Sequence, residues 1–283
     1  MSASTAIAVL QNGTLRWSSP SNFNDPYDVP TELTYEFQPT EVMMAALQRC
    51  IELVESPPAD VTRITPKLRQ LIEAVKQGMP EPQKQALLAR FREDVQNAAP
   101  TGTGLRDLVA MWRTFIPELR ILCLCESATH VAMWHHYADQ YRGVVVEFTC
   151  SDELDSAWLG AEQVTYNEAG NPLARLETWA DLLVLETAHA VQDLTHLATF
   201  TKAADWGYER EWRLLSYKRN QDIGNYTDYR FDRRELKAVY LGPRITEDDA
   251  QTVKALTTMY PYAKLYRSQV GLGPRLKFHS DAL

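Results

Sequence analysis

The sequence lacks the short motifs that mark the commonest nucleotide-binding and hydrolytic enzymes. It has no glycine-rich dinucleotide fingerprint, no phosphate-binding P-loop, no serine nucleophile elbow and no HExxH zinc motif. The sequence therefore gives no support for the enzyme classes that are built on those motifs.

Long hydrophobic runs are also missing. Short apolar runs such as Val144–Val146 occur, but none approaches the roughly 20 residues that a membrane-spanning helix needs. The segment Met1–Thr5 has no basic residues followed by an apolar stretch, which a secretion signal would have. We therefore expect a cytoplasmic protein that makes no contact with a membrane.

Cysteine is scarce, with four residues in the chain: Cys50, Cys123, Cys125 and Cys150. The pair at 123 and 125 forms a CxC rather than a CxxC, and no nearby residues complete a zinc-binding set. Cysteines without such partners usually behave as small hydrophobic residues. We expect buried, reduced thiols.

Basic residues are outnumbered, because 29 lysines and arginines face 37 aspartates and glutamates, which gives a net charge of −8. This balance argues against a protein that coats nucleic acid through bulk charge, although it leaves room for a local basic patch. The hydrophobic content of 45% in 283 residues is enough for a sizeable core. Disorder, coiled coil and a disulfide scaffold are excluded for the chain as a whole.

The order of expected elements predicts an α+β fold with a mixed or antiparallel β-sheet core. We expect one domain over residues 1–283, with a helical insert at about 40–116, because helix signals such as Thr65-Pro66 recur there. Strands are expected at residues 14–19, 119–125, 144–149, 210–217, 238–241, 263–266 and 275–279. Further helices are expected at 129–142, at 176–197 and after Thr246.

The first candidate site lies on the helix expected at 129–142. His135 and Asp139 are four residues apart and therefore share a helix face, where they could bind a metal or form an orienting pair. No third ligand can be identified from spacing. The alternative is an aromatic helix that packs Trp134 and Tyr137 into the core.

The second candidate is the strand that includes Glu209, Glu211 and Arg213. Side chains alternate along a strand, so these three would share one face. Charge on both faces of a strand is unusual and suits the edge of a cleft. The alternative is a salt-bridge ladder on an exposed sheet face.

The third candidate is the loop Ser21–Asp28, which is dense in asparagine, aspartate and serine. Its polar side chains could bind a polar ligand, or they could bond their own backbone in Asx turns. Phe23 and Tyr27 are expected to pin the loop to the body of the protein.

These segments together resemble the domain of unknown function 2971 family. The motifs follow in order as SSPSNFNDPYD, CLCESATHVAMWHHYADQYRGVVVEF, VTYNEAGNPL, KAADWGYEREWRLL and AVYLGPRIT, over residues 15–278. Five motifs in order are more specific than any one of them. The chain departs from the family at residues 1–10, where the family's short strand with tyrosine and lysine is not found.

The layout of that family is similar to that of ADP-ribosyltransferases, especially those that modify nucleic acids. The resemblance implies NAD as substrate, Glu211 as the catalytic glutamate and Glu209 as the reserve choice. Arg16 or Arg213 would hold the pyrophosphate, and Trp17 or Tyr27 would stack on nicotinamide. The residues implied to bind NAD are Arg16, Trp17, Ser18, Phe23, Asn24, Asp25, Tyr27, Trp134, Tyr137 and Arg213.

By this resemblance, the chain is expected to be an NAD-using ADP-ribosyltransferase that modifies a macromolecule, in phage defence or a toxin system. The acceptor, nucleic acid or protein, stays open. One alternative is a non-catalytic ligand-sensing or protein-binding module. Another is a metal-dependent nuclease or hydrolase built around His135, His136 and Asp139.

Overall fold

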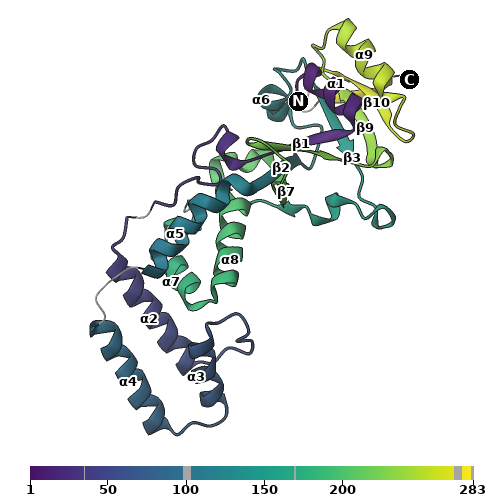
Figure 1. The fold of residues 1–283 in the computed structure, drawn as a ribbon. Helices are drawn as coiled ribbons and strands as arrows, with labels where there is room; N and C mark the ends of the chain where they lie inside the picture. The colour runs from purple at the N-terminus through teal and green to yellow at the C-terminus, as the bar shows by residue number, and fades with distance from the viewer. Residues whose placement is uncertain (35, 98–102, 169, 271–275, 282–283) are drawn as a thin grey trace. The chain divides into compact units, whose positions relative to one another are not determined.

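The computed structural model describes residues 1–34, 36–97, 103–168, 170–270 and 276–281, and their fold is α+β (Figure 1). The chain divides into two compact units. Unit 1 comprises Met1–Asn22, Glu118–Val164 and Asp205–Leu283, and unit 2 comprises Phe23–Pro117 and Thr165–Ala204. The α+β prediction with largely antiparallel sheets is confirmed.

The first sheet of unit 1 has five strands in the order β4-β7-β2-β1-β8, and every neighbouring pair is antiparallel. The strands are β1 (Thr14–Ser18), β2 (Leu119–Cys125), β4 (Glu162–Gln163), β7 (Glu211–Tyr217) and β8 (Tyr226–Arg230). The predicted strands at β1, β2 and β7 are confirmed to within one residue at each end. β8 was not predicted, because its charged and aromatic residues give no apolar face.

One face of this sheet is apolar. Leu15 and Trp17 of β1 and Leu214 of β7 are buried there with Trp158, and the rings of Trp17 and Tyr229 lie 4.9 Å apart. Since side chains alternate along each strand, the opposite face receives Arg16, Glu211 and Arg213. The first face thus anchors the sheet, and the other face carries these polar side chains beside buried apolar ones such as Ile121.

The second sheet of unit 1 has four strands in the order β11-β10-β9-β3. The strands are β3 (Val144–Phe148), β9 (Leu236–Leu241), β10 (Lys264–Gln269) and β11 (Lys277–Asp281), and only the pair β9 and β10 is parallel among the described strands of this sheet. Residue 275, the start of the last predicted strand, lies outside the described residues. The other three predicted strands are confirmed.

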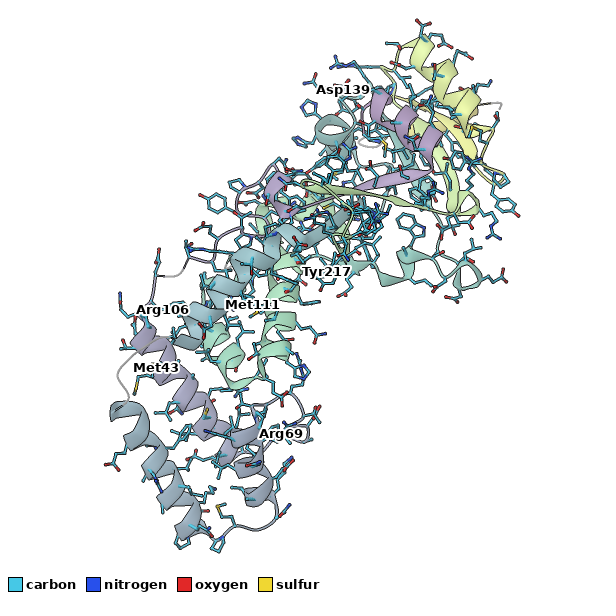
Figure 2. All side chains as sticks on the ribbon, viewed as in Figure 1. Met43, Arg69, Arg106, Met111, Asp139 and Tyr217 are labelled. Atoms are coloured by element: carbon cyan, nitrogen blue, oxygen red, sulfur yellow. The ribbon has the colours of Figure 1, made fainter. Side chains whose placement is uncertain are left out.

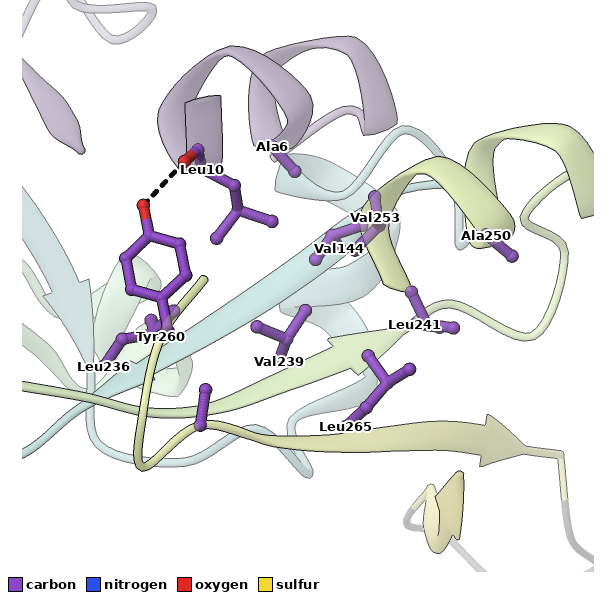
Figure 3. Packing of buried hydrophobic residues seen from close by; sticks show 11 residues of the cluster. Ala6, Leu10, Val144, Leu236, Val239, Leu241, Ala250, Val253, Tyr260 and Leu265 are labelled. Atoms are coloured by element: carbon purple, nitrogen blue, oxygen red, sulfur yellow. Dashed lines mark hydrogen bonds between the residues drawn. The ribbon is translucent and has the colours of Figure 1, made fainter. Parts of the chain in front are cut away.

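Two helices pack against this sheet to form a core: α1 (Ala3–Asn12) and α9 (Glu247–Thr257). Leu10, Val239 and Val253 are buried in it, and the Tyr260 hydroxyl donates to the Leu10 carbonyl oxygen at 2.7 Å (Figure 3). Thr246 caps α9 through a bond from the Asp249 amide, as predicted. α1 was not predicted. It occupies residues 3–12, where no helix or strand was expected.

The helix expected at 129–142 ends early. α6 covers only Val131–Tyr137, and the next turn places Asp139, Gln140 and Tyr141 at φ values of 47°, 52° and 72°. This left-handed turn is stabilised by long-range backbone bonds, since the Arg244 amide donates to the Tyr141 carbonyl at 3.1 Å. Contacts with a distant loop therefore override local helix propensity here.

Unit 2 is mainly helical. Its helices are α2 (Pro39–Glu55), α3 (Pro66–Lys76), α4 (Glu81–Asn97), α5 (Thr103–Phe115), α7 (Leu176–Val184) and α8 (Thr187–Phe200), and its strands β5 (Thr165–Asn167) and β6 (Thr201–Ala203) pair in parallel. Ile51, Ile72 and Leu88 bring three helices of the predicted insert into one core. Residues 98–102 of the insert lie outside the described residues.

The single helix predicted at 176–197 is wrong, because the chain breaks between α7 and α8. Leu185 is extended and forms a β-bridge with Ile64, while the Glu186 amide donates to the Arg63 carbonyl at 2.9 Å. Pairing with the segment before α3 replaces the helical bonds at this point.

Short 3-10 turns complete the fold: η1 (Pro20–Asn22), η2 (Ile116–Glu118), η3 (Asp152–Leu154), η4 (Ala157–Gly160), η5 (Pro172–Ala174), η6 (Ala204–Glu209) and η7 (Arg233–Glu235). In the described part of the chain, no helix has both the length and the apolar character needed to cross a bilayer.

Gly242 makes the closest backbone approach to the turn after α6. A Cβ at this position would lie 2.2 Å from the Tyr141 carbonyl oxygen and 2.8 Å from that of Gly143. We expect Gly242→Ala to lower the free energy of unfolding by about 1–3 kcal/mol or more, because backbone must move. Urea denaturation measures this change.

Gly160→Ala is the matched control, since its Cβ would meet only Leu214 Cδ2 at 3.8 Å. A change of about 0.5 kcal/mol or less is expected there. Equal stability of the two variants would contradict the close approach at Gly242.

Candidate functional site

The polar face of the five-stranded sheet, which we call the polar sheet face, collects residues from distant parts of the sequence. β7 and β2 pair Glu211 with Cys125 and Arg213 with Cys123, and β1 joins through Ser18 opposite Ile121. Directly paired residues lie on the same side of a sheet. Arg16 and Ser18 therefore share a face with Glu211 and Arg213.

Glu211 and Arg213 form a bidentate ion pair on β7. Arg213 Nε donates to Glu211 Oε1 at 2.7 Å, and Arg213 Nη2 donates to Oε2 at 2.9 Å. The side chains are only 5% and 0% exposed, respectively. A salt-bridge ladder on an exposed sheet face, the alternative prediction, is not what is found here, because the pair is buried. Burial makes the pair costly to form and costly to break.

Glu209 is a second buried carboxylate, 2% exposed, at the end of η6. The Tyr137 hydroxyl donates to Glu209 Oε1 at 2.7 Å, which connects α6 to the segment before β7. Arg210, between the two glutamates, has a φ of 45°. A non-glycine residue in this region costs on the order of 1–3 kcal/mol, and such strain concentrates at functional sites.

Trp134 of α6 and Asp139 of the turn that follows α6 have structural roles. Trp134 is 1% exposed, and its Nε1 donates to the Ala128 carbonyl at 2.7 Å, so its ring belongs to the core. Asp139 is exposed at the surface (Figure 2), and its carboxylate accepts two bonds from Arg142, at 3.0 and 3.2 Å. Across the residues that the structure describes, no group of three or more metal-ligating side chains comes together. The metal hypothesis therefore lacks its third ligand.

The residues of β1 point in two directions. Trp17 is 7% exposed and packs in the core, whereas Arg16 is on the polar sheet face. Arg16 binds Asp228 of the neighbouring strand at 3.0 and 3.2 Å, and its guanidinium carbon lies 3.8 Å from the centre of the Tyr226 ring. Ser18 is half-buried on that face.

The loop that precedes α2 belongs to unit 2. Asp25 Oδ1 accepts from the Tyr27 amide at 2.9 Å, so the Asx turn considered from the sequence is present. Tyr27 is 86% exposed, and the expectation that its ring pins the loop is wrong. Phe23 is half-buried and Asn24 is exposed.

Sequence reasoning missed a buried ion pair in the same unit. Lys202 Nζ of β6 lies 3.4 Å from Asp28 Oδ2, and both side chains are 6% exposed. Val29, 1% exposed, has a φ of 48°, which is a rare conformation for a β-branched residue. Asp28 and Lys202 each belong to one of the motifs quoted for the family resemblance. That shared membership was the only hint in the sequence that the two residues matter.

The cysteines differ from expectation. Cys123 and Cys150 are exposed, so the prediction of burial is wrong for these two; the described part of the chain contains all four cysteines, and none forms a disulfide there. Burial raises the pKa of the half-buried Cys125 thiol, and it raises the pKa of Cys50 to about 11. At neutral pH both of these thiols are protonated.

The model of a protein family of unknown function, DUF2971, matches residues 133–214. This match confirms the resemblance over the segment that runs from α6 to β7 and contains Tyr137, Glu209, Glu211 and Arg213. Comparison with curated proteins and with solved structures finds no match.

The buried ion pair between Lys202 and Asp28 is expected to stabilise unit 2. Lys202→Met removes the cation beside the buried Asp28 carboxylate, and breaking a buried pair costs about 3–5 kcal/mol. Urea denaturation followed by circular dichroism measures the loss. In the double variant with Asp28→Asn, part of that stability returns.

Lys218→Met serves as the control, because Lys218 lies 3.6 Å from Glu118 in a pair that is 30% and 48% exposed. Exposed pairs contribute about 0–1 kcal/mol. Equal losses for Lys202→Met and Lys218→Met would show that the buried pair is not special.

Proposed function

We propose that the protein is an NAD-using transferase of the ADP-ribosyltransferase kind, with its active site on the polar sheet face. The observation that carries this proposal is the arrangement of two buried carboxylates, Glu209 and Glu211, on either side of the strained Arg210. Buried acids that hydrogen bonds hold in one orientation, next to a strained backbone, are typical of catalytic sites. An ADP-ribosyltransferase-like fold is part of the same proposal.

The chemistry requires a carboxylate at the ribose. The bond between nicotinamide and C1′ breaks, nicotinamide leaves with the bonding electrons, and positive charge develops on the sugar as in glycoside cleavage. A nucleophile on the acceptor then bonds to C1′ and gives up its proton. A carboxylate excluded from water stabilises the developing charge more strongly than one in bulk solvent.

Glu211 is the proposed catalytic carboxylate, and the family resemblance is what favours it over Glu209. The two bonds from Arg213 hold the Glu211 carboxylate in one orientation, which suits a group that must meet the ribose hydroxyls in a fixed geometry. Glu209 is the reserve choice, and Tyr137 orients it in a similar way.

The pyrophosphate would then be bound by Arg16 rather than by Arg213, whose guanidinium is 0% exposed and bound to Glu211. The Arg16 side chain is 56% exposed and lies on the same face of the sheet. Asp228 and Tyr226 orient it, and a guanidinium can bind phosphate oxygens through two parallel bonds. A role in phage defence or a toxin system extends this proposal and follows from the family resemblance alone.

A second candidate is a non-catalytic ligand-sensing or protein-binding module. It is favoured by the contacts within unit 1: Arg213 binds Glu211, Tyr137 binds Glu209, and Trp17 and Trp134 are core residues. In this case, both buried carboxylates would serve the stability and specificity of the fold.

Nicotinamide release tests the first candidate. Purified protein is incubated with NAD, with and without RNA, DNA or cell lysate, and nicotinamide is quantified by chromatography. Glu211→Gln is expected to lower the rate by about 100-fold or more, the scale seen when a transition-state contact is lost. Glu209→Gln is measured beside it, because Glu211→Gln alters the partner of a buried arginine.

Glu118→Gln is the control, since Glu118 is an acid of unit 1 whose side chain is 48% exposed. Its rate should equal that of the wild type, and thermal melting confirms that every variant is folded. Full activity in folded Glu209→Gln and Glu211→Gln would exclude the proposed site. Absence of both nicotinamide release and NAD binding would favour the second candidate.

A further inference from the structure

A continuous row of aromatic rings borders Glu209 in unit 1, and we call it the aromatic strip. Its members are Trp206, Tyr208, His136, His135 and Tyr141, with successive ring centroids 6.2, 6.3, 5.3 and 6.0 Å apart. They come from η6, from α6 and from the left-handed turn after α6.

The strip is accessible to solvent. Tyr208 is 39% exposed, His135 and His136 are exposed, and Trp206 and Tyr141 are half-buried. Isolated exposed rings are common on protein surfaces, but a contiguous row of them marks a binding site. The row is held in place by the bond from the Tyr137 hydroxyl to Glu209, which connects the two elements that supply most of the rings.

Cations accompany the strip. The guanidinium carbon of Arg244 lies 5.8 Å from the centre of the Tyr141 ring. Arg142 and Arg210 are exposed on the same segments, where they pair with Asp139 at 3.0 Å and with Glu126 at 2.8 Å. Unit 1 has 17 lysines and arginines against 19 aspartates and glutamates, a net charge of −2, so most of the chain's net negative charge of −8 lies in unit 2. Unit 1 therefore repels polyanions far less than the whole-chain charge suggests.

We infer that the aromatic strip binds unpaired bases of single-stranded nucleic acid, which is the acceptor of the proposed transferase. Sites for single strands combine stacking rings with cations, and tyrosine, tryptophan, histidine and arginine all stack on bases. Cations that could meet the phosphates accompany the rings, because Arg142 and Arg210 are close to strip residues in the sequence and Arg244 lies beside Tyr141. In a duplex the faces of the bases are covered, so a duplex cannot use the strip.

The position of the strip gives it a role in the reaction. Tyr208 directly precedes Glu209, so a base stacked on Tyr208 is brought to the segment that carries the carboxylates. A nitrogen of that base would bond to C1′ of the ribose as nicotinamide leaves, and would then lose its proton. This role rests on the proposed function, whereas binding to the strip is measured without NAD.

Fluorescence anisotropy tests the inference. The probes are fluorescein-labelled 12-nucleotide single strands of RNA and DNA of mixed sequence, and a duplex of the same DNA sequence. We expect the full chain to bind single strands at least tenfold more tightly than the duplex. Tyr208→Ala and, separately, His136→Ala should weaken binding about five- to hundredfold, as loss of one stacking ring does.

Tyr262→Ala is the matched control, because Tyr262 is 66% exposed and lies outside the strip. Its affinity should stay within twofold of the wild type. The inference is overturned if single strands do not bind, if the duplex binds equally well, or if Tyr262→Ala weakens binding as much as Tyr208→Ala. It is also overturned if a nuclease-treated protein fraction, but no oligonucleotide, accelerates nicotinamide release.

The binding assay tests the aromatic strip, the nicotinamide assay tests the transferase, and a negative result in one does not imply a negative result in the other. Strand binding that depends on Tyr208, without any nicotinamide release, would support the strip and exclude the transferase. Nicotinamide release that depends on Glu211, without strand binding, would support the transferase and exclude the strip as its acceptor site.

Discussion

The ion pair between Glu211 and Arg213 is the interaction on which the polar sheet face depends. Both side chains are almost fully buried, and two hydrogen bonds join them within a single strand. Removing either one would leave a buried charge without its main partner, which costs more than the intact pair contributes. The antiparallel register of β7 with β2 then fixes this pair opposite Cys123 and Cys125.

Three long-range contacts hold residues of the quoted motifs in place. Tyr137 binds Glu209, Lys202 binds Asp28, and the backbone at Tyr141 meets the loop at Gly242. Each of these contacts lies beside a non-glycine residue with positive φ. A strained backbone of this kind persists only where surrounding contacts impose it. The long-range contacts therefore hold these residues in backbone conformations that the local sequence alone would not adopt.

Much of the fold could be predicted from local signals. β1 and β2 follow from their short apolar and β-branched runs, α9 from Thr246 and its acidic first turn, and α3 from Thr65-Pro66. Tertiary contacts decided the rest, as at Leu185, where a bridge to Ile64 interrupts the predicted helix. In the candidate site, alternation placed Glu211 and Arg213 on one face, but Tyr137 lies 72 residues from its partner Glu209, beyond any local pattern. The same holds in unit 2 for Lys202, which lies 174 residues from its partner Asp28.

A crystal structure with a non-hydrolysable NAD analogue would show most directly whether Glu211 of the polar sheet face, or Glu209 two residues before it, binds the ribose of NAD. We expect the ribose hydroxyls within about 2.7–3.2 Å of a carboxylate oxygen of Glu211 or Glu209. We also expect the pyrophosphate at Arg16. An analogue bound elsewhere, with Arg213 and Tyr137 still the groups that hold the two carboxylates, would contradict the account.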